Sequence, residues 1–146
     1  MIKTTLLVLC LSFGLSATAA ENNKKNGLVL KQIMLKLSKD MSAIANAIVL
    51  EDWERVQQHA DSIANHEQAP LIEKRKILQY LGDDMAQFKS FDQIVHDKSV
   101  ELSEQAKKGN SDAVIKVYSE VMQGCLDCHS RFKPRIQSRF YSFKKE

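Results

Sequence analysis

The chain has 146 residues, enough for one globular domain, and its 21 Lys and Arg residues exceed its 18 Asp and Glu residues to give a net charge of +3. So small a positive excess does not indicate a nucleic-acid-binding protein. The excess gathers late in the sequence, where a solvated tail is a simpler interpretation than a docking patch, at Lys133, Arg135, Arg139, Lys144 and Lys145.

The first twenty residues have the pattern of a secretory signal peptide. Lys3 gives a positive start, a largely apolar stretch covers residues 6–15, and small residues follow it. The stretch is too short to remain as a membrane anchor, and Cys10 lies inside it rather than at a lipoprotein cleavage site. We therefore expect residues 1–20 to be cleaved, residues 21–146 to form one domain, and no integral membrane segment.

Beyond the signal peptide, apolar residues recur at intervals of three and four, which predicts helices with one buried face. A first helix is expected from about Asn26 to Val49. One face of it carries Leu30, Met34 (beside Ile33), Leu37, Met41, Ile44 and Ile48. Asp52 is a suitable N-cap for a second helix that ends before Pro70. The apolar face of this second helix comprises Trp53, Val56, Ala60 and Ile63.

Two longer helices and one short helical piece are expected in the second half of the chain. The short piece covers Leu71 to Leu81 and stops at Gly82, and a third helix then ends at Gly109 as its C′ residue. Apolar residues of the third helix are Met85, Phe88, Phe91, Val95 and Leu102. Ser111 is the expected cap of a fourth helix, whose apolar face comprises Val114, Val117, Val121, Cys125 and Cys128.

No segment alternates at period two in the manner of a strand, so the expected fold class is all-α. Four antiparallel helices with mostly short links make an up-down four-helix bundle, a fold that builds cofactor sites between facing helices. We expect the cofactor described next to lie in the core of this bundle.

The pattern C-x-x-C-H at Cys125, Cys128 and His129 is typical of a covalent attachment site for haem c. Two thiols must reach two vinyl groups on one edge of the porphyrin, and residues three apart on a helix lie on one face. His129 follows about 40° from Cys125 around the helix axis, at roughly 100° per residue. Its imidazole can therefore serve as the proximal iron ligand.

Other interpretations of these residues fit less well. A structural zinc site needs about four ligands, and His59, His66 and His96 have no metal-site spacing. A thioredoxin-like motif requires a βαβ context, which the sequence does not predict. A plain disulfide between the two cysteines leaves His129 unexplained. Export to an oxidising compartment agrees with haem attachment.

A single C-x-x-C-H close to the C-terminus, on the last of four helices and behind a signal peptide, resembles the cytochrome c′ and cytochrome c-556 family. Phe88, the first-helix pattern and the Glu51-Asp52-Trp53 start of the second helix agree with it, although only the Cys-Leu-Asp-Cys-His motif is highly specific. The resemblance implies a periplasmic protein with one haem c, often a homodimer. We expect redox partner proteins, and we expect no enzymatic activity because the sequence offers no general base paired with an open iron site.

The family has two functional forms, which differ at the sixth iron ligand. In the c′ form the iron is five-coordinate and binds nitric oxide or carbon monoxide, whereas in the c-556 form a methionine of the first helix completes the ligand set. The resemblance places Met34 at that distal position. Leu30 then occupies a commonly basic position, with Lys31 beside it, and Lys133 matches the basic residue that follows the motif.

Two functions from different classes follow from these ligand sets. Histidine–methionine ligation favours a one-electron carrier, because the soft thioether raises the reduction potential. An open distal face would instead make a module that binds a diatomic gas. We expect Met41 to be a packing residue of the core. Met85 and Met122 are weaker candidates for the sixth iron ligand than either Met34 or Met41. We expect His59, His66 and His96 to be partly exposed rather than iron ligands, and Trp53, Phe88 and Phe91 to pack in the core or on the haem.

Overall fold

The computed structural model describes residues 28–141, and these residues are helical with no β-strand among them. The elements are α1 (Leu30–Val49), α2 (Trp53–Ala64), α3 (Leu71–Leu81), the 3-10 turn η1 (Gly82–Asp84), α4 (Met85–Lys107) and α5 (Ser111–Phe140). The expected all-α class is confirmed for this part of the chain. The expected signal peptide at 1–20, Asn26, Lys144 and Lys145 lie outside the described residues.

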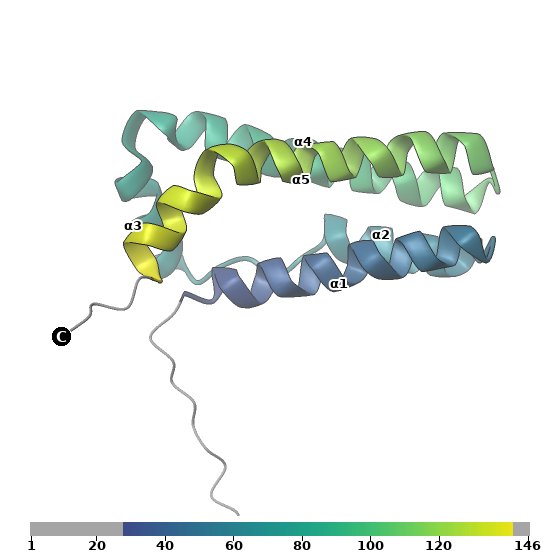
Figure 1. Ribbon diagram of the computed structural model, residues 1–146, viewed down its shortest axis with the longest axis horizontal. Helices are drawn as coiled ribbons and strands as arrows, with labels where there is room; N and C mark the ends of the chain where they lie inside the picture. Colours follow the sequence, from purple (N-terminus) through teal and green to yellow (C-terminus); the bar gives the residue numbers. More distant parts are fainter. Residues whose placement is uncertain (1–27, 142–146) are drawn as a thin grey trace, which may run out of the picture.

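The long helices form a bundle of two layers. Helices α1 and α2 lie side by side in one layer and α4 and α5 in the other, while α3 lies across one end (Figure 1). The closest packing joins α4 to α5, α2 to α4 and α1 to α2, whereas α1 and α5 make few contacts with each other. The bundle is therefore tight on three sides and sparse between α1 and α5.

Local sequence signals explain several helix ends. The Asp52 side chain accepts a hydrogen bond from the backbone N–H of Arg55 at 3.1 Å, so the expected N-cap of α2 is confirmed. Gly82 after α3 and Gly109 after α4 have φ of 55° and 64°, a left-handed conformation that side chains disfavour. The expected ends at these two glycines are also confirmed.

Two expected helix starts are wrong. The cap of α5 is Asn110, not Ser111, because the Asn110 side chain accepts the Ala113 N–H at 3.2 Å and Ser111 is already helical. Helix α1 begins at Leu30, while Leu28 is not helical, so the start near Asn26 is too early. Its first amides are held by Glu73 of α3 rather than by a preceding turn of helix.

The apolar side chains form two separate clusters. The main core joins all four long helices and comprises Ile44, Ala47, Val56, Ala60, Ile63, Leu102, Ala106, Val114, Val117 and Val121. The end core lies where α3 meets the last turns of α5 and comprises Ile77, Leu81, Phe132 and Ile136. Burial of both clusters drives the packing of the amphipathic helices.

The face of α1 differs in part from the expected one. Ile44 is fully buried, but Ile33, Ala47 and the carboxylate residue Asp40 are the other buried positions. The remaining expected residues are half-buried, at Leu30, Met34, Leu37, Met41 and Ile48. The charged Asp40 is tolerated because Lys36, His59 and Ser62 all bond to its carboxylate.

Helix α5 is long and bends towards its C-terminal end (Figure 1). Pro134 lies inside it, where the missing amide hydrogen and the ring weaken the helical ladder. Arg131 and Arg135 flank the proline, and both reach Asp84 of η1, at 2.9 and 2.6 Å. Lys133, Arg135 and Arg139 therefore lie in a helix and not in the expected tail, and Arg135 is ion-paired.

Candidate functional site

Cys125, Cys128 and His129 lie within one uninterrupted stretch of α5. All three side chains are half-buried, and the buried position next to them is Gly124 rather than the expected Cys125. Both cysteines are free thiols. Because residues three apart share a helix face, the two sulfur atoms are presented on the same side of α5.

The two thiols are protonated at neutral pH. Burial raises the pKa of the Cys125 thiol, and it raises the pKa of the Cys128 thiol to about 11, with smaller effects from Asp92 and Cys125. Exchange with disulfides and nucleophilic attack need a thiolate, which a low pKa would supply. The pair therefore lacks the activation expected of a redox dithiol, and the described residues supply no βαβ context for one.

His129 is suited to donate a nitrogen lone pair. Burial lowers the pKa of its imidazole, and the positive charge of Lys133 one turn later lowers it further. The ring is consequently neutral at pH 7, the form in which histidine binds metals.

An apolar, aromatic environment adjoins Cys128. This residue packs against the end core together with Phe88 and Phe91 of α4. The two rings meet Phe132 edge-on, with centroid separations of 5.3 and 6.2 Å. Trp53, by contrast, packs against the main core and lies beside Gly109, at the α4–α5 connection.

Gly124 brings α4 and α5 close together directly before the motif. A Cβ atom at this position would meet Cγ2 of Val95 at 3.1 Å and Cγ2 of Ile94 at 3.5 Å. Hydrophobic periodicity does not predict this role of Gly124, although a glycine inside a helical pattern is itself a signal of close packing.

Tyr118 of α5, and Tyr141 directly after it, make bridging hydrogen bonds to α1 and to the residues just before α1, on either side of the motif. The Tyr118 phenol donates to the carbonyl oxygen of Met41 at 3.3 Å, and the Tyr141 phenol donates to that of Leu28 at 3.4 Å. Burial and then the neighbouring Cys125 raise the pKa of Tyr118. The structure thus links α1 to α5 before and after the segment that carries Cys125 and His129.

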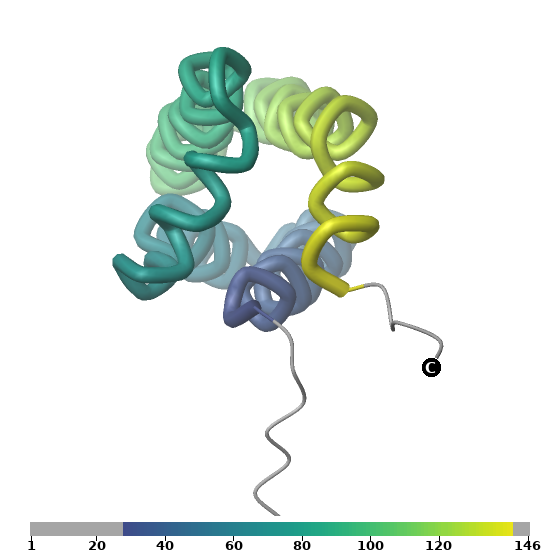
Figure 2. Tube along the Cα trace, turned by 90° about the vertical axis from the view of Figure 1, so that its left-hand side faces the viewer, coloured from purple at the N-terminus to yellow at the C-terminus, as the bar shows by residue number. Residues whose placement is uncertain are grey.

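Met34 lies on the part of α1 between these two bridges. It is half-buried, and among the described residues it belongs to neither the main core nor the end core. Met41 packs against the main core, as expected, and Met85 and Met122 are exposed. Helices α1 and α5 make few contacts with each other, and the last turns of α5 come down beside the start of α1 (Figure 2).

The remaining histidines are engaged elsewhere. Nδ1 of His59 lies 2.9 Å from Asp40 on α1, and Nδ1 of His96 lies 2.8 Å from the carbonyl oxygen of Ala64. The two ring nitrogens of His66 face the Glu67 carbonyl oxygen and the Asp92 carboxylate. Within residues 28–141, no three His, Cys, Asp or Glu side chains gather as a metal site.

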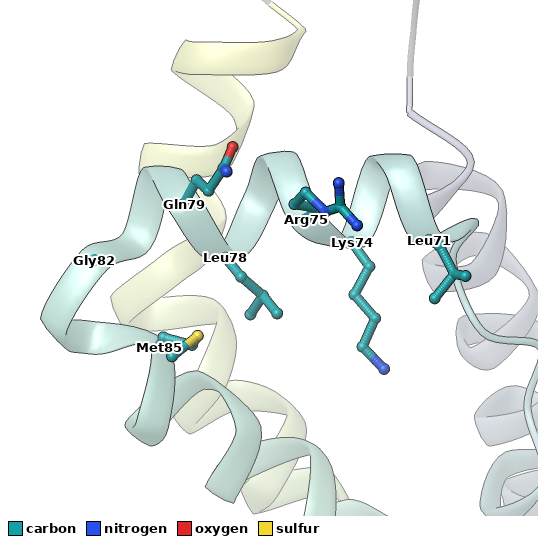
Figure 3. Close-up of a pocket in the computed structure, with 7 residues that line it drawn as sticks. All are labelled: Leu71, Lys74, Arg75, Leu78, Gln79, Gly82 and Met85. Carbon is teal, nitrogen blue, oxygen red and sulfur yellow. The ribbon is translucent and has the colours of Figure 1, made fainter.

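Two surface hollows lie away from the motif. One lies along α3 and the start of α4, with Leu71, Leu78 and Met85 as its apolar walls and Lys74 and Arg75 beside them (Figure 3). The other separates the start of α1 from the chain after α2, around Ile33 and His66. Neither hollow is lined by the cysteines, His129 or Met34.

Comparison of the chain with protein-family models, with curated proteins and with solved structures finds no match. The resemblance to cytochrome c′ and cytochrome c-556 therefore rests on the residues of this chain alone. None of the helices within residues 28–141 has the length and apolar character needed to span a membrane.

Proposed function

We propose that this protein is a small exported c-type cytochrome that carries single electrons in the periplasm. One haem c is held covalently by Cys125 and Cys128, His129 is the proximal iron ligand and Met34 is the distal ligand. The observation that carries the proposal is the placement of two free cysteines, three residues apart, and of the adjacent His129 on one uninterrupted stretch of α5.

The chemistry of this donor set fits haem attachment. Each thiol would add its sulfur and its proton across a vinyl double bond of the haem, so Cys125 and Cys128 would each hold the group through one thioether bond. The end core beside Cys128 offers an apolar and aromatic surface to such a ring, through Phe88 and Phe91. When bound, the haem supplies an iron atom that changes its charge by one electron.

The tyrosine bridges support an antiparallel arrangement of α1 and α5. Tyr118 is bonded to Met41, and Tyr141, later in the sequence, is bonded to Leu28, earlier in the sequence. The two helices therefore run in opposite directions. Consecutive helices joined by short links then complete an up-down bundle. A haem between α1 and α5 would occupy the side of the bundle where helix contacts are fewest.

The same bridges favour Met34 over Met41 as the distal ligand. Met34 precedes Met41 by seven residues, and Cys125 follows Tyr118 by seven residues. At about 1.5 Å per residue, both steps move roughly 10 Å in the same direction along the bundle. Met34 is therefore level with the attachment site, whereas Met41 is level with Tyr118.

A methionine sulfur at the sixth position favours the carrier over the gas-binding form. It keeps the ligand set unchanged between the ferric and ferrous states and favours the ferrous state. Redox partner proteins are then the expected partners, and neither catalysis nor nucleic-acid binding is part of the proposal. The family resemblance is the only support for a homodimer.

Covalent attachment is tested by haem staining of the denatured protein. We expect staining of the unmutated chain after expression with export, weaker or altered attachment in Cys125→Ala or Cys128→Ala, and none in the double variant. Cys10→Ala is the matched control, because Cys10 lies in the expected signal peptide, and its staining should be unchanged. Staining that persists in the denatured double variant would contradict the proposal.

A further inference from the structure

The start of α1 is fixed by a side chain from a distant part of the sequence. Both carboxylate oxygens of Glu73, in α3, accept backbone N–H groups at 2.7 Å, one from Val29 and one from Leu30. Glu73 is only 9% exposed. Carboxylates bonded to backbone N–H groups make short, charge-assisted hydrogen bonds, and they also oppose the positive end of the helix dipole.

Glu73 is also the N-terminal cap that α1 lacks in its own sequence. Val29 occupies the N-cap position without a side-chain hydrogen bond, and the first turn of α1 contains no acidic residue. Helix α3 has no extensive packing against α1. The carboxylate therefore provides a specific link between two helices that otherwise contact each other little.

A second hydrogen bond, from the residue that follows α5, also fixes the start of α1. The Tyr141 phenol, directly after α5, donates to the carbonyl oxygen of Leu28 at 3.4 Å. Leu28, Val29 and Leu30 are thus tied to α3 through Glu73 and to the end of α5 through Tyr141. Both α3 and the end of α5 lie at the end of the bundle from which α1 starts (Figure 2).

Met34 follows this junction by one helical turn. Leu30 and Met34 are four residues apart, so any shift or fraying of the first turn of α1 also displaces Met34. Helix ends fray unless their free N–H groups are satisfied. Burial in the cores does not replace this support, because Met34 belongs to neither cluster among the described residues.

We propose that Glu73 is a positioning residue for the distal iron ligand: it caps α1 from α3, and with Tyr141 it holds Met34 at the level of the attachment site. The inference rests on the proposed haem function, but the cap itself exists in the polypeptide and is measurable without reference to the iron. Glu73→Gln is the sharpest change, since it keeps the size of the side chain and removes one charged acceptor.

The test is made on the haem-loaded protein with two measurements. Amide hydrogen exchange should speed up roughly fivefold at Val29 and Leu30 in Glu73→Gln, since a lost cap costs about 1 kcal/mol. The ferric spectrum should shift from low spin towards a mixture with high spin, and the near-infrared sulfur-to-iron band should weaken. Tyr141→Phe should change both measurements in the same direction, by less.

Asp52→Ala provides the control, because Asp52 caps α2 through the Arg55 N–H and alanine removes that acceptor. It should speed exchange at Arg55 and leave the spectrum unchanged. Unchanged exchange at Val29 and Leu30 in Glu73→Gln would overturn the inference, as would faster exchange with an unaltered spectrum. An unmutated protein that stains for haem but is high-spin would overturn both the Met34 assignment and the positioning role, and one without haem would overturn the proposed function itself.

Discussion

Gly124 lies so close to Val95 that a Cβ atom on the glycine would stand 3.1 Å from Cγ2 of the valine. This contact sets the separation of α4 and α5 at the residue directly before Cys125. Few Cβ atoms have so short a contact, so a side chain larger than alanine must push the two helices apart or force Val95 to a new rotamer.

We predict that Gly124→Val destabilises the protein by about 1–3 kcal/mol, the usual cost of overpacking a tight contact. Gly124→Ala should lie within about 1 kcal/mol of the unmutated protein, because its better helix propensity offsets the contact with Val95. The free energy of unfolding in urea measures both. Lys116→Val, at an exposed position of α5, is the control for the poor helix propensity of valine. Equal losses in Lys116→Val and Gly124→Val would show that the close contact has no energetic role.

The hydrogen bonds of Tyr118 and Tyr141 place Met34 level with Cys125, and this predicts how a change at Met34 alters the absorption spectrum. Met34→Ala should convert low-spin ferric iron to high spin, remove the sulfur-to-iron band, and let carbon monoxide bind the ferrous protein quickly. Because the Met34 side chain is only half-buried in the polypeptide, its truncation should cost about 2 kcal/mol, the low end for a methionine. Absorption spectra and flow kinetics of carbon monoxide binding give the answer.

Met41→Ala is the matched control for this experiment, since Met41 packs against the main core on the same helix. It should lower the unfolding free energy by a similar or larger amount and leave the spectrum unaltered. A spectrum that responds to Met41→Ala alone would show that Met41, seven residues after Met34, is the distal ligand. High-spin iron in the unmutated protein would instead favour the five-coordinate, gas-binding form.

The His66–Asp92 pair gives a pH dependence of known sign. The Asp92 carboxylate raises the pKa of the His66 imidazole, with burial opposing this shift and the Glu67 carbonyl assisting it. A raised pKa in the folded state contributes stability that is fully present below about 6.5, the unfolded value, and is lost as the pH rises through the folded value. NMR titration of His66 should therefore give a pKa above 6.5.

Asp92→Asn should bring that pKa down and remove this part of the stability gain at acid pH. His96, whose Nδ1 faces the backbone oxygen of Ala64, offers a comparison within the same spectra. A His66 resonance that titrates at the same pH with and without the Asp92 carboxylate would contradict the ion pair at 3.5 Å.

Local signals in the sequence were enough to predict most of the helical framework. Asp52, Gly82 and Gly109 determine helix ends through their own side chain or backbone freedom, and all three act as expected. The Ser111 cap was a wrong choice between adjacent residues of similar capping strength, because Asn110 reaches the required amide. Such errors shift a boundary by one residue and leave the helix in place.

Features that depend on distant contacts could not be predicted from periodicity. Glu73 reads as an exposed residue of a basic helix, and only the folded chain shows that it caps α1 44 positions earlier. The buried Asp40 looks misplaced on an apolar face until Lys36, His59 and Ser62 are seen around it. The same network engages Nδ1 of His59, a contact that spacing alone could not reveal.

The contact between Leu28 and Tyr141 joins residues 113 positions apart, and this has a consequence for the order of folding. The loops between α1 and α2 and between α4 and α5 are short, so contacts at that end of the bundle close little chain and form early. The opposite end must wait until the last turn of α5 meets the first residues of α1. Hydrogen exchange during refolding should accordingly protect the amides near Val56 and Val114 before those near Leu30, so that the end of the bundle with the cysteines is the last to close.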